Sequence, residues 1–175
     1  MDTLCRLMSS DLPLRIEPKR LARTGEIIAG QYAIHDMHRL GELLHDDAGT
    51  VIFRLEFYFD GNQNIPFIKG CIEAQVNIPC QRCLGGMVFN INNPVYLGVI
   101  SSRTESPALP EECEPLQLDD ESIALQELIE DELILALPIS AMHETEKCKA
   151  TELLNELNDK SRSSPFAALD KLNRK

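Results

Sequence analysis

Two runs of alternating apolar and polar residues constrain the fold of this chain more than any other feature. In residues 51–59, Val, Phe, Leu, Phe and Phe occupy every second position, and a period of two is typical of a strand with one buried face. In residues 67–78 the same period puts one apolar set on a single face, namely Ile68, Ile72, Ala74, Val76 and Ile78. The turn sequence Asp-Gly-Asn at 60–62 lies between the two runs. The sequence therefore predicts an antiparallel hairpin.

Two shorter strands are expected after the hairpin. A Gly-Gly turn at 85–86 follows it, and residues 87–91 and 95–100 keep the β pattern. Pro94 lies between these two segments, and a proline has no N–H group to donate to a sheet. We therefore expect Pro94 to separate two strands.

The strongest helical pattern spans residues 121–136 and ends before Pro138. Its apolar stripe consists of Leu125, Leu128, Ile129, Leu133 and Ala136. Glu127, Glu130 and Asp131 are expected on the opposite, solvated face. Acid–base or Mg²⁺ chemistry is the alternative interpretation of this carboxylate run, which comprises Glu127, Glu130, Asp131 and Glu132.

Further helical patterns occupy residues 34–45, 150–158 and 165–173. In the first of them the apolar residues at helical spacing are Met37, Leu40, Leu43 and Leu44. Strands followed by helices predict an α+β fold, with a mostly antiparallel sheet packed by the C-terminal acidic amphipathic helix. A chain of 175 residues fits one domain. We place an α+β domain at 1–150 and a basic tail, helical or partly disordered, at 151–175.

The charge distribution disfavours tight binding to bare RNA. The net charge is −11, Trp is absent and aromatic residues make up only 5%, whereas RNA-binding proteins use basic and aromatic surfaces. Residues 104–146 hold thirteen acidic residues and no Lys or Arg. Two short basic clusters are the candidate RNA or partner contacts, unless they only solubilise the surface; they are Arg15, Lys19, Arg20 and Arg23, and Lys171, Arg174 and Lys175.

The cysteines are expected to be reduced. No apolar run reaches the roughly 20 residues that span a bilayer, and residues 1–8 do not resemble a signal peptide. These features predict a cytoplasmic protein without membrane contact. In that compartment the six cysteines would be thiols or metal ligands.

The sharpest local motif is Cys80-Gln81-Arg82-Cys83, between a strand and the Gly-Gly turn. Two thiolates at a tight turn can reach one metal ion, and structural zinc takes four ligands. His143 and Cys148 form the other close His/Cys pair. Together the four residues would make a Cys₃His zinc site. Ordinary reduced side chains and a redox dithiol stay open as alternatives, although redox motifs usually begin a helix.

Other candidate residues give weaker patterns. His35 and His38 lie three apart on an expected helix and form either a metal pair or solvated side chains. Cys5, Cys71 and Cys113 lack neighbouring ligand residues and are expected to be free thiols. The chain carries no Walker loop, no Rossmann glycine pattern and no HExxH or GxSxG motif.

Three segments in a fixed order resemble the YceD family, whose members are called large ribosomal RNA subunit accumulation proteins. The segments are the CxxC motif followed by Leu84, the stretch ELIEDELILALPISAMHETEKC at 127–148, and the ending PFAALDKLNRK at 165–175. The resemblance covers roughly residues 12–175 and is specific from about Cys80 onward. Three cysteines and one histidine match the family's positions, namely Cys80, Cys83, His143 and Cys148.

The resemblance implies a non-catalytic, cytoplasmic ribosome-biogenesis factor needed for the synthesis, processing or stability of 23S ribosomal RNA. It also implies metal binding through the cysteines. Expected partners are the large-subunit precursor particle, its ribosomal RNA, basic ribosomal proteins or assembly factors, the last two through the acidic stretch 104–146. A zinc-dependent hydrolase and a thiol redox protein using Cys80 and Cys83 are the alternatives. A hydrolase needs an open metal position, and three thiolates with one imidazole leave none.

Overall fold

The computed structural model describes residues 12–60, 65–101, 109–118 and 120–160. Five strands form the main sheet in the order β2-β3-β4-β5-β6. Their bounds are Ile27–Ala33 for β2, Thr50–Phe59 for β3, Pro66–Pro79 for β4, Gly86–Ser101 for β5 and Glu114–Leu118 for β6. All neighbours are antiparallel except β5 and β6. The chain is therefore an α+β protein with a mostly antiparallel sheet.

The hairpin predicted from the alternating runs is confirmed as β3 and β4. Val51 lies opposite Ala74 and Phe59 lies opposite Pro66. The side chains at every second position of β3, from Val51 to Phe57, are buried, and those between them are exposed. Each such fully buried large apolar side chain contributes about 1.5–3 kcal/mol, so this alternation fixes which face of the sheet forms the core.

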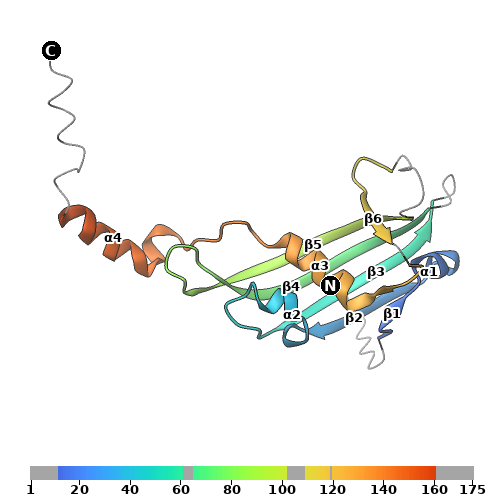
Figure 1. The fold of residues 1–175 in the computed structure, drawn as a ribbon, viewed down its shortest axis with the longest axis horizontal. Coiled ribbons are helices and arrows are strands. Elements are labelled where there is room, and N and C mark those ends of the chain that lie inside the picture. The colour runs from blue at the N-terminus through green and yellow to red at the C-terminus, as the bar shows by residue number, and fades with distance from the viewer. Residues whose placement is uncertain (1–11, 61–64, 102–108, 119, 161–175) are drawn as a thin grey trace, which may run out of the picture.

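Helices α1 (Pro18–Thr24), α2 (His38–Gly41) and α3 (Leu125–Ala136) contribute to one hydrophobic core together with the sheet. A two-stranded sheet of β1 (Arg15–Ile16) and β7 (Ile123–Ala124) lies beside α3. Figure 1 shows α4 (Lys149–Lys160) at the end of the molecule where β4 turns into β5, and β6 towards the other end. The expected helix at 150–158 corresponds to α4, and the one at 165–173 lies outside the described residues. The domain boundary at 150 stays a prediction.

The expectation that Pro94 separates two strands is wrong. β5 runs unbroken through Pro94, which lies opposite Cys71 of β4. β6 pairs with β5 only from Leu97 to Ser101, so at Pro94 β5 is an edge strand. An edge strand tolerates proline because it can turn the side without an N–H away from the sheet.

The expected helix at 34–45 is only partly formed. A 3₁₀ helix, η1 (Ile34–Asp36), precedes α2, and the chain leaves helical structure after Gly41. Glycine inside a helix costs about 1 kcal/mol relative to alanine. Met37, Leu40 and Leu44 are buried as expected, but Leu43 is 46% exposed.

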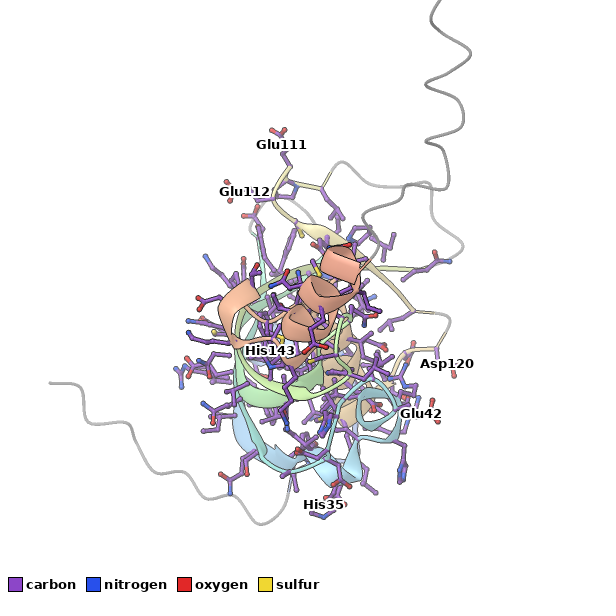
Figure 2. The ribbon with its side chains drawn as sticks, turned by 90° about the vertical axis from the view of Figure 1, so that its left-hand side faces the viewer. His35, Glu42, Glu111, Glu112, Asp120 and His143 are labelled. Atoms are coloured by element: carbon purple, nitrogen blue, oxygen red, sulfur yellow. The ribbon has the colours of Figure 1, made fainter. Side chains whose placement is uncertain are left out.

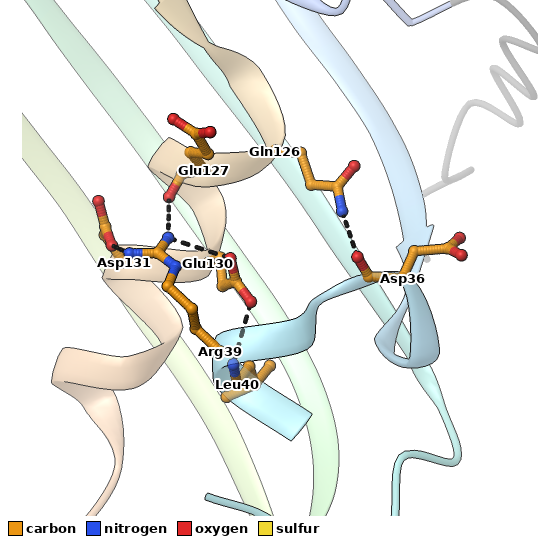
Figure 3. Close-up of polar contacts among 7 residues, drawn as sticks. All are labelled: Asp36, Arg39, Leu40, Gln126, Glu127, Glu130 and Asp131. Atoms are coloured by element: carbon orange, nitrogen blue, oxygen red, sulfur yellow. Dashed lines mark hydrogen bonds and ion pairs between the residues drawn. The ribbon is translucent and has the colours of Figure 1, made fainter. Parts of the chain in front are cut away.

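The expectation that Glu130 faces solvent is also wrong. Its side chain is only 7% exposed. One carboxylate oxygen accepts a hydrogen bond from the backbone N–H of Leu40 at 3.0 Å, and the other accepts from Arg39 Nε at 3.1 Å. Figure 3 shows this carboxylate between α3 and α2. A periodicity argument fails here because specific donors on α2 make the burial of a charge favourable.

Among the described residues, no helix combines the length and the apolar character needed to cross a bilayer.

Candidate metal centre

The CxxC motif forms a tight turn between β4 and β5. The N–H of Cys80 donates to the carbonyl of Gly85 at 2.9 Å, and the N–H of Leu84 donates to the carbonyl of Cys80 at 2.8 Å. Leu84 closes the turn with a φ of 58°, in the left-handed region that favours glycine. This closure holds both cysteine side chains on one side of the turn.

The segment after α3 returns to this turn. The N–H of Gln81 donates to the carbonyl of Ala141 at 2.8 Å, which fixes the residues around His143 beside the CxxC motif. Cys148 follows η2 (Thr145–Lys147) and directly precedes α4. In Figure 2, His143 lies at the end of the molecule that carries α4. The tertiary fold thus brings together two parts of the sequence about 60 residues apart.

The four predicted ligand residues converge. The ligand atoms of Cys80, Cys83, His143 and Cys148 all lie within 4.8 Å of one another. A tetrahedron with zinc–sulfur bonds of about 2.3 Å has edges of about 3.8 Å. The observed spacing is therefore within about 1 Å of that of a zinc tetrahedron. Cys80 and Cys148 are buried, as the ligands of a structural centre usually are.

The histidine is oriented as a metal ligand. His143 Nε2 lies 3.2 Å from the carbonyl oxygen of Gly86. Because a carbonyl can only accept a hydrogen bond, Nε2 carries the proton and Nδ1 keeps its lone pair. Nδ1 points into the cluster and lies 3.4 Å from Cys83 Sγ. Metal-binding histidines are commonly oriented by such a contact to a backbone carbonyl.

Backbone N–H groups stabilise a thiolate at Cys80. The N–H of His143 lies 3.4 Å from its sulfur and that of Arg82 lies 3.5 Å away. The hydrogen bond from His143 is the main reason that the pKa of Cys80 falls to about 5. At Cys83 the N–H of Gly85 acts to lower the pKa, but burial and the neighbouring thiols outweigh it and raise the pKa. The cluster thus favours the thiolate form at Cys80 and disfavours it at Cys83.

This donor set fits a structural zinc ion. Three sulfurs and one imidazole nitrogen fill all four tetrahedral positions, so no position stays open for water or substrate. That closed set counts against the hydrolase alternative. The CxxC motif connects two strands instead of opening a helix, and this counts against the redox alternative.

The predicted N-terminal basic residues are exposed on β1 and α1. Arg15 donates to the hydroxyl and the carbonyl of Ser122 at 3.0 and 2.8 Å. Arg20 lies 3.7 Å from a carboxylate oxygen of Glu17, while Lys19 and Arg23 are exposed on α1. The other predicted contacts lie outside the described residues, namely Lys171, Arg174 and Lys175.

The remaining cysteine and histidine candidates do not join a cluster. His35 and His38 are exposed on η1 and α2, and neither belongs to a metal-ligand group among the described residues. Cys71 donates to Asn92 at 2.9 Å, and Cys113 is buried. Both are free thiols.

Sequence reasoning did not single out Asn93, and it considered Glu132 only as part of the carboxylate run that is either a solvated face or an acid–base or Mg²⁺ site. Glu132 on α3 is only 9% exposed, and its carboxylate accepts a hydrogen bond from Asn93 Nδ2 of β5 at 3.1 Å. Burial and the charge of Glu114 raise the pKa of Glu132. The available signal was Asn93, a polar residue among apolar core positions of β5, since its neighbours Ile91 and Val95 on that face are buried.

Comparisons with known proteins agree with the resemblance of the motifs. The family model described as "Large ribosomal RNA subunit accumulation protein YceD" matches residues 68–173. A Haemophilus influenzae protein of that name is 31% identical over 172 residues, which cover 94% of this chain and 97% of the relative. No solved structure matches the chain. From the extent of these matches, the chain belongs to the YceD family.

Proposed function

We propose that this protein is a non-catalytic ribosome-biogenesis factor, needed for the synthesis, processing or stability of 23S ribosomal RNA. The observation that carries the proposal is the family membership, because the relative from Haemophilus influenzae is named for accumulation of the large ribosomal RNA. The protein would act in the cytoplasm on precursors of the large subunit. The closed donor set of the cysteine cluster agrees with a role without catalysis.

The net charge of −11 supports partner binding over direct RNA binding, because an acidic chain repels phosphates. Residual contact with RNA would use the clusters Arg15–Arg23 and Lys171–Lys175. Such contact should weaken steeply with salt, since each phosphate contact releases counterions.

A deletion strain tests the function. We expect less mature 23S relative to 16S RNA and a defect in large-subunit precursors on sucrose gradients, restored by a plasmid-borne copy. Tagged protein should sediment with large-subunit precursors. An unchanged 23S to 16S ratio with a normal subunit profile would refute the proposal.

We also propose that Cys80, Cys83, His143 and Cys148 hold a structural zinc ion. Bound zinc would join the β4–β5 turn to the segment between α3 and α4, and in such sites the binding energy is folding energy. The proposal is supported by ligand atoms within 4.8 Å of one another and by the orientation of His143.

Metal analysis of protein purified under reducing conditions tests this site. We expect about one zinc per chain, as a Cys₃His set requires, and a large drop in thermal stability for Cys83→Ser. The matched control is Cys71→Ser, which removes a thiol that lies outside the cluster. Metal-free protein, or equal stability of the two variants, would contradict a structural zinc.

A further inference from the structure

The long strand β5 is paired on one side only over most of its length. β4 pairs with it from Gly86 to Gly98, whereas β6 pairs only from Leu97 to Ser101. Within the described parts of the chain, no strand pairs with the other edge of residues 86–96. Every second residue of a strand turns its N–H and C=O towards one side. This edge can therefore accept another strand, with one donor missing at Pro94, which has no N–H to offer there.

A groove of about 860 Å³ lies along this edge beside the start of β6. It is lined by residues 93–97 of β5, by Lys69 and Gly70 of the adjacent β4, and by Glu132 and Leu135 of α3. Pro110, Glu111, Glu112 and Glu114, which lead into β6, complete the lining. Because β6 begins opposite Leu97, a strand in the groove would extend the line of β6 along β5. The exposed side chain of Leu135 offers an apolar contact there.

The groove is strongly acidic. Among the described residues, the lining holds four glutamates and one cation, Lys69; the glutamates are Glu111, Glu112, Glu114 and Glu132. The Lys69 ammonium lies over the ring of Tyr96, 5.7 Å from its centroid. Figure 2 shows Glu111 and Glu112 projecting outwards from their loop. Such a lining attracts cationic side chains and repels nucleic-acid phosphates.

Glu132 adds an observation independent of the exposed charges. Its side chain lines the groove although it is nine-tenths buried. Oε2 accepts a hydrogen bond from Asn93, but no side chain or backbone group of the described residues donates to Oε1. A buried acceptor without a donor is costly, and a Lys or Arg side chain entering the groove would supply that donor.

We propose that this groove binds a Lys- and Arg-rich extended segment of a partner protein, which pairs with β5 in line with β6. The inference rests on the proposed function, because proteins of a ribosomal precursor contact phosphates through Lys- and Arg-rich segments. Backbone pairing would give affinity, and the glutamates would select the charge of the segment.

The test uses the full chain and a fluorescent synthetic peptide in which Lys and Arg alternate with Val. Fluorescence anisotropy should detect binding to the wild type. Glu111→Gln/Glu112→Gln and Glu132→Gln should each weaken it by about tenfold, the scale of one or two charge-assisted hydrogen bonds. The matched control is Glu42→Gln/Asp47→Asn, which removes the same charge from exposed residues outside the groove. Equal weakening by the control would overturn the proposal.

Backbone pairing has its own control. The same peptide with N-methyl groups at alternate residues keeps its charge but cannot form a sheet, so it should lose binding. Hydrogen exchange should show protection in residues 86–96 and none on β2 at the other sheet edge. Equal binding of the methylated peptide, or protection of the groove by a single-stranded RNA instead, would overturn the proposal. These in vitro results do not depend on the 23S to 16S ratio, so failure of the groove and failure of the proposed function are distinguishable.

Discussion

Removing the carboxylate of Glu130 should destabilise the protein more than removing any exposed charge on α3. Glu130 joins α3 to α2 through two groups (Figure 3), the N–H of Leu40 at 3.0 Å and the guanidinium of Arg39 at 3.1 Å. No side chain on α2 itself caps the start of that helix. Glu130 therefore supplies, from another helix, an acceptor near the N-terminus of α2.

The magnitude follows from these contacts. A hydrogen bond to a charged group contributes about 1.5–3 kcal/mol, and a buried donor left unpaired costs about 1–3 kcal/mol. Glu130→Ala loses the ion pair with Arg39 and leaves the N–H of Leu40 unpaired. We expect a loss of about 2–4 kcal/mol, mainly from the hydrogen bond to Leu40, because the Arg39 side chain is 52% exposed and keeps its contact with Asp131. Glu130→Gln keeps an acceptor for Leu40 and should lose less.

Asp131→Asn is the matched control, because Asp131 also contacts Arg39, at 2.6 Å, but with its side chain 51% exposed. Exposed ion pairs contribute at most about 1 kcal/mol. Urea unfolding followed by far-UV circular dichroism measures all the variants. The reasoning is refuted if Glu130→Ala lowers the free energy of unfolding no more than Asp131→Asn does, at equal m-values. If Glu130→Ala does not fold, Glu130→Gln must still lower the free energy of unfolding more than Asp131→Asn does.

Three further substitutions test local features of the fold. Gly70→Ala should destabilise the protein by on the order of 3 kcal/mol, because the added Cβ would clash with the carbonyl oxygen of Arg54. The control is Gly41→Ala, whose Cβ would meet no atom within 4 Å. Urea unfolding measures the stability of both variants. Leu84→Gly should stabilise by about 1 kcal/mol in thermal unfolding, since Leu84 is 72% exposed with a φ of 58°, and a loss of stability would contradict this. Glu132→Gln should stabilise the isolated protein by about 1 kcal/mol at neutral pH, because burial and Glu114 raise the pKa of Glu132 in the folded state. Because the pKa is raised, the wild type loses stability as the pH rises from the ordinary Glu pKa of 4.5 through the folded-state pKa. The stability advantage of Glu132→Gln over the wild type should therefore shrink as the pH is lowered towards 4.5. An advantage that does not change with pH would refute the assignment.

The sequence predicted the parts of the fold that repeat a simple period. The hairpin β3–β4 was predictable because one set of side chains is buried and the next exposed without interruption. β2 was not, because its side chains are mostly half-buried and show no alternation. β6 was also missed, since its five residues form a strand only through parallel pairing with β5, which no local pattern encodes.

The sequence predicted which residues form the metal cluster, but not how the backbone brings them together. Cysteine and histidine are the ligands that zinc prefers, so residue type together with the CxxC spacing and the close His143/Cys148 pair selected the four. The route that joins them depends on the backbone hydrogen bond from Gln81 to Ala141, which has no sequence signature. Whether the cluster holds zinc stays a prediction.

Glu130 and Glu132 are both on α3, but only the burial of Glu130 is explained by contacts within the fold. Periodicity gives the same expectation for both, a solvated carboxylate, and both are buried. Both oxygens of Glu130 have donors from α2, so its burial is explained by the fold alone. Among the described residues Glu132 has one side-chain donor, Asn93, and Glu132 lines an acidic groove beside a free strand edge. A buried polar group that lacks a partner within its own chain is most often found at a functional site. The missing contact at Glu132 therefore points to a partner, while the satisfied contacts of Glu130 do not.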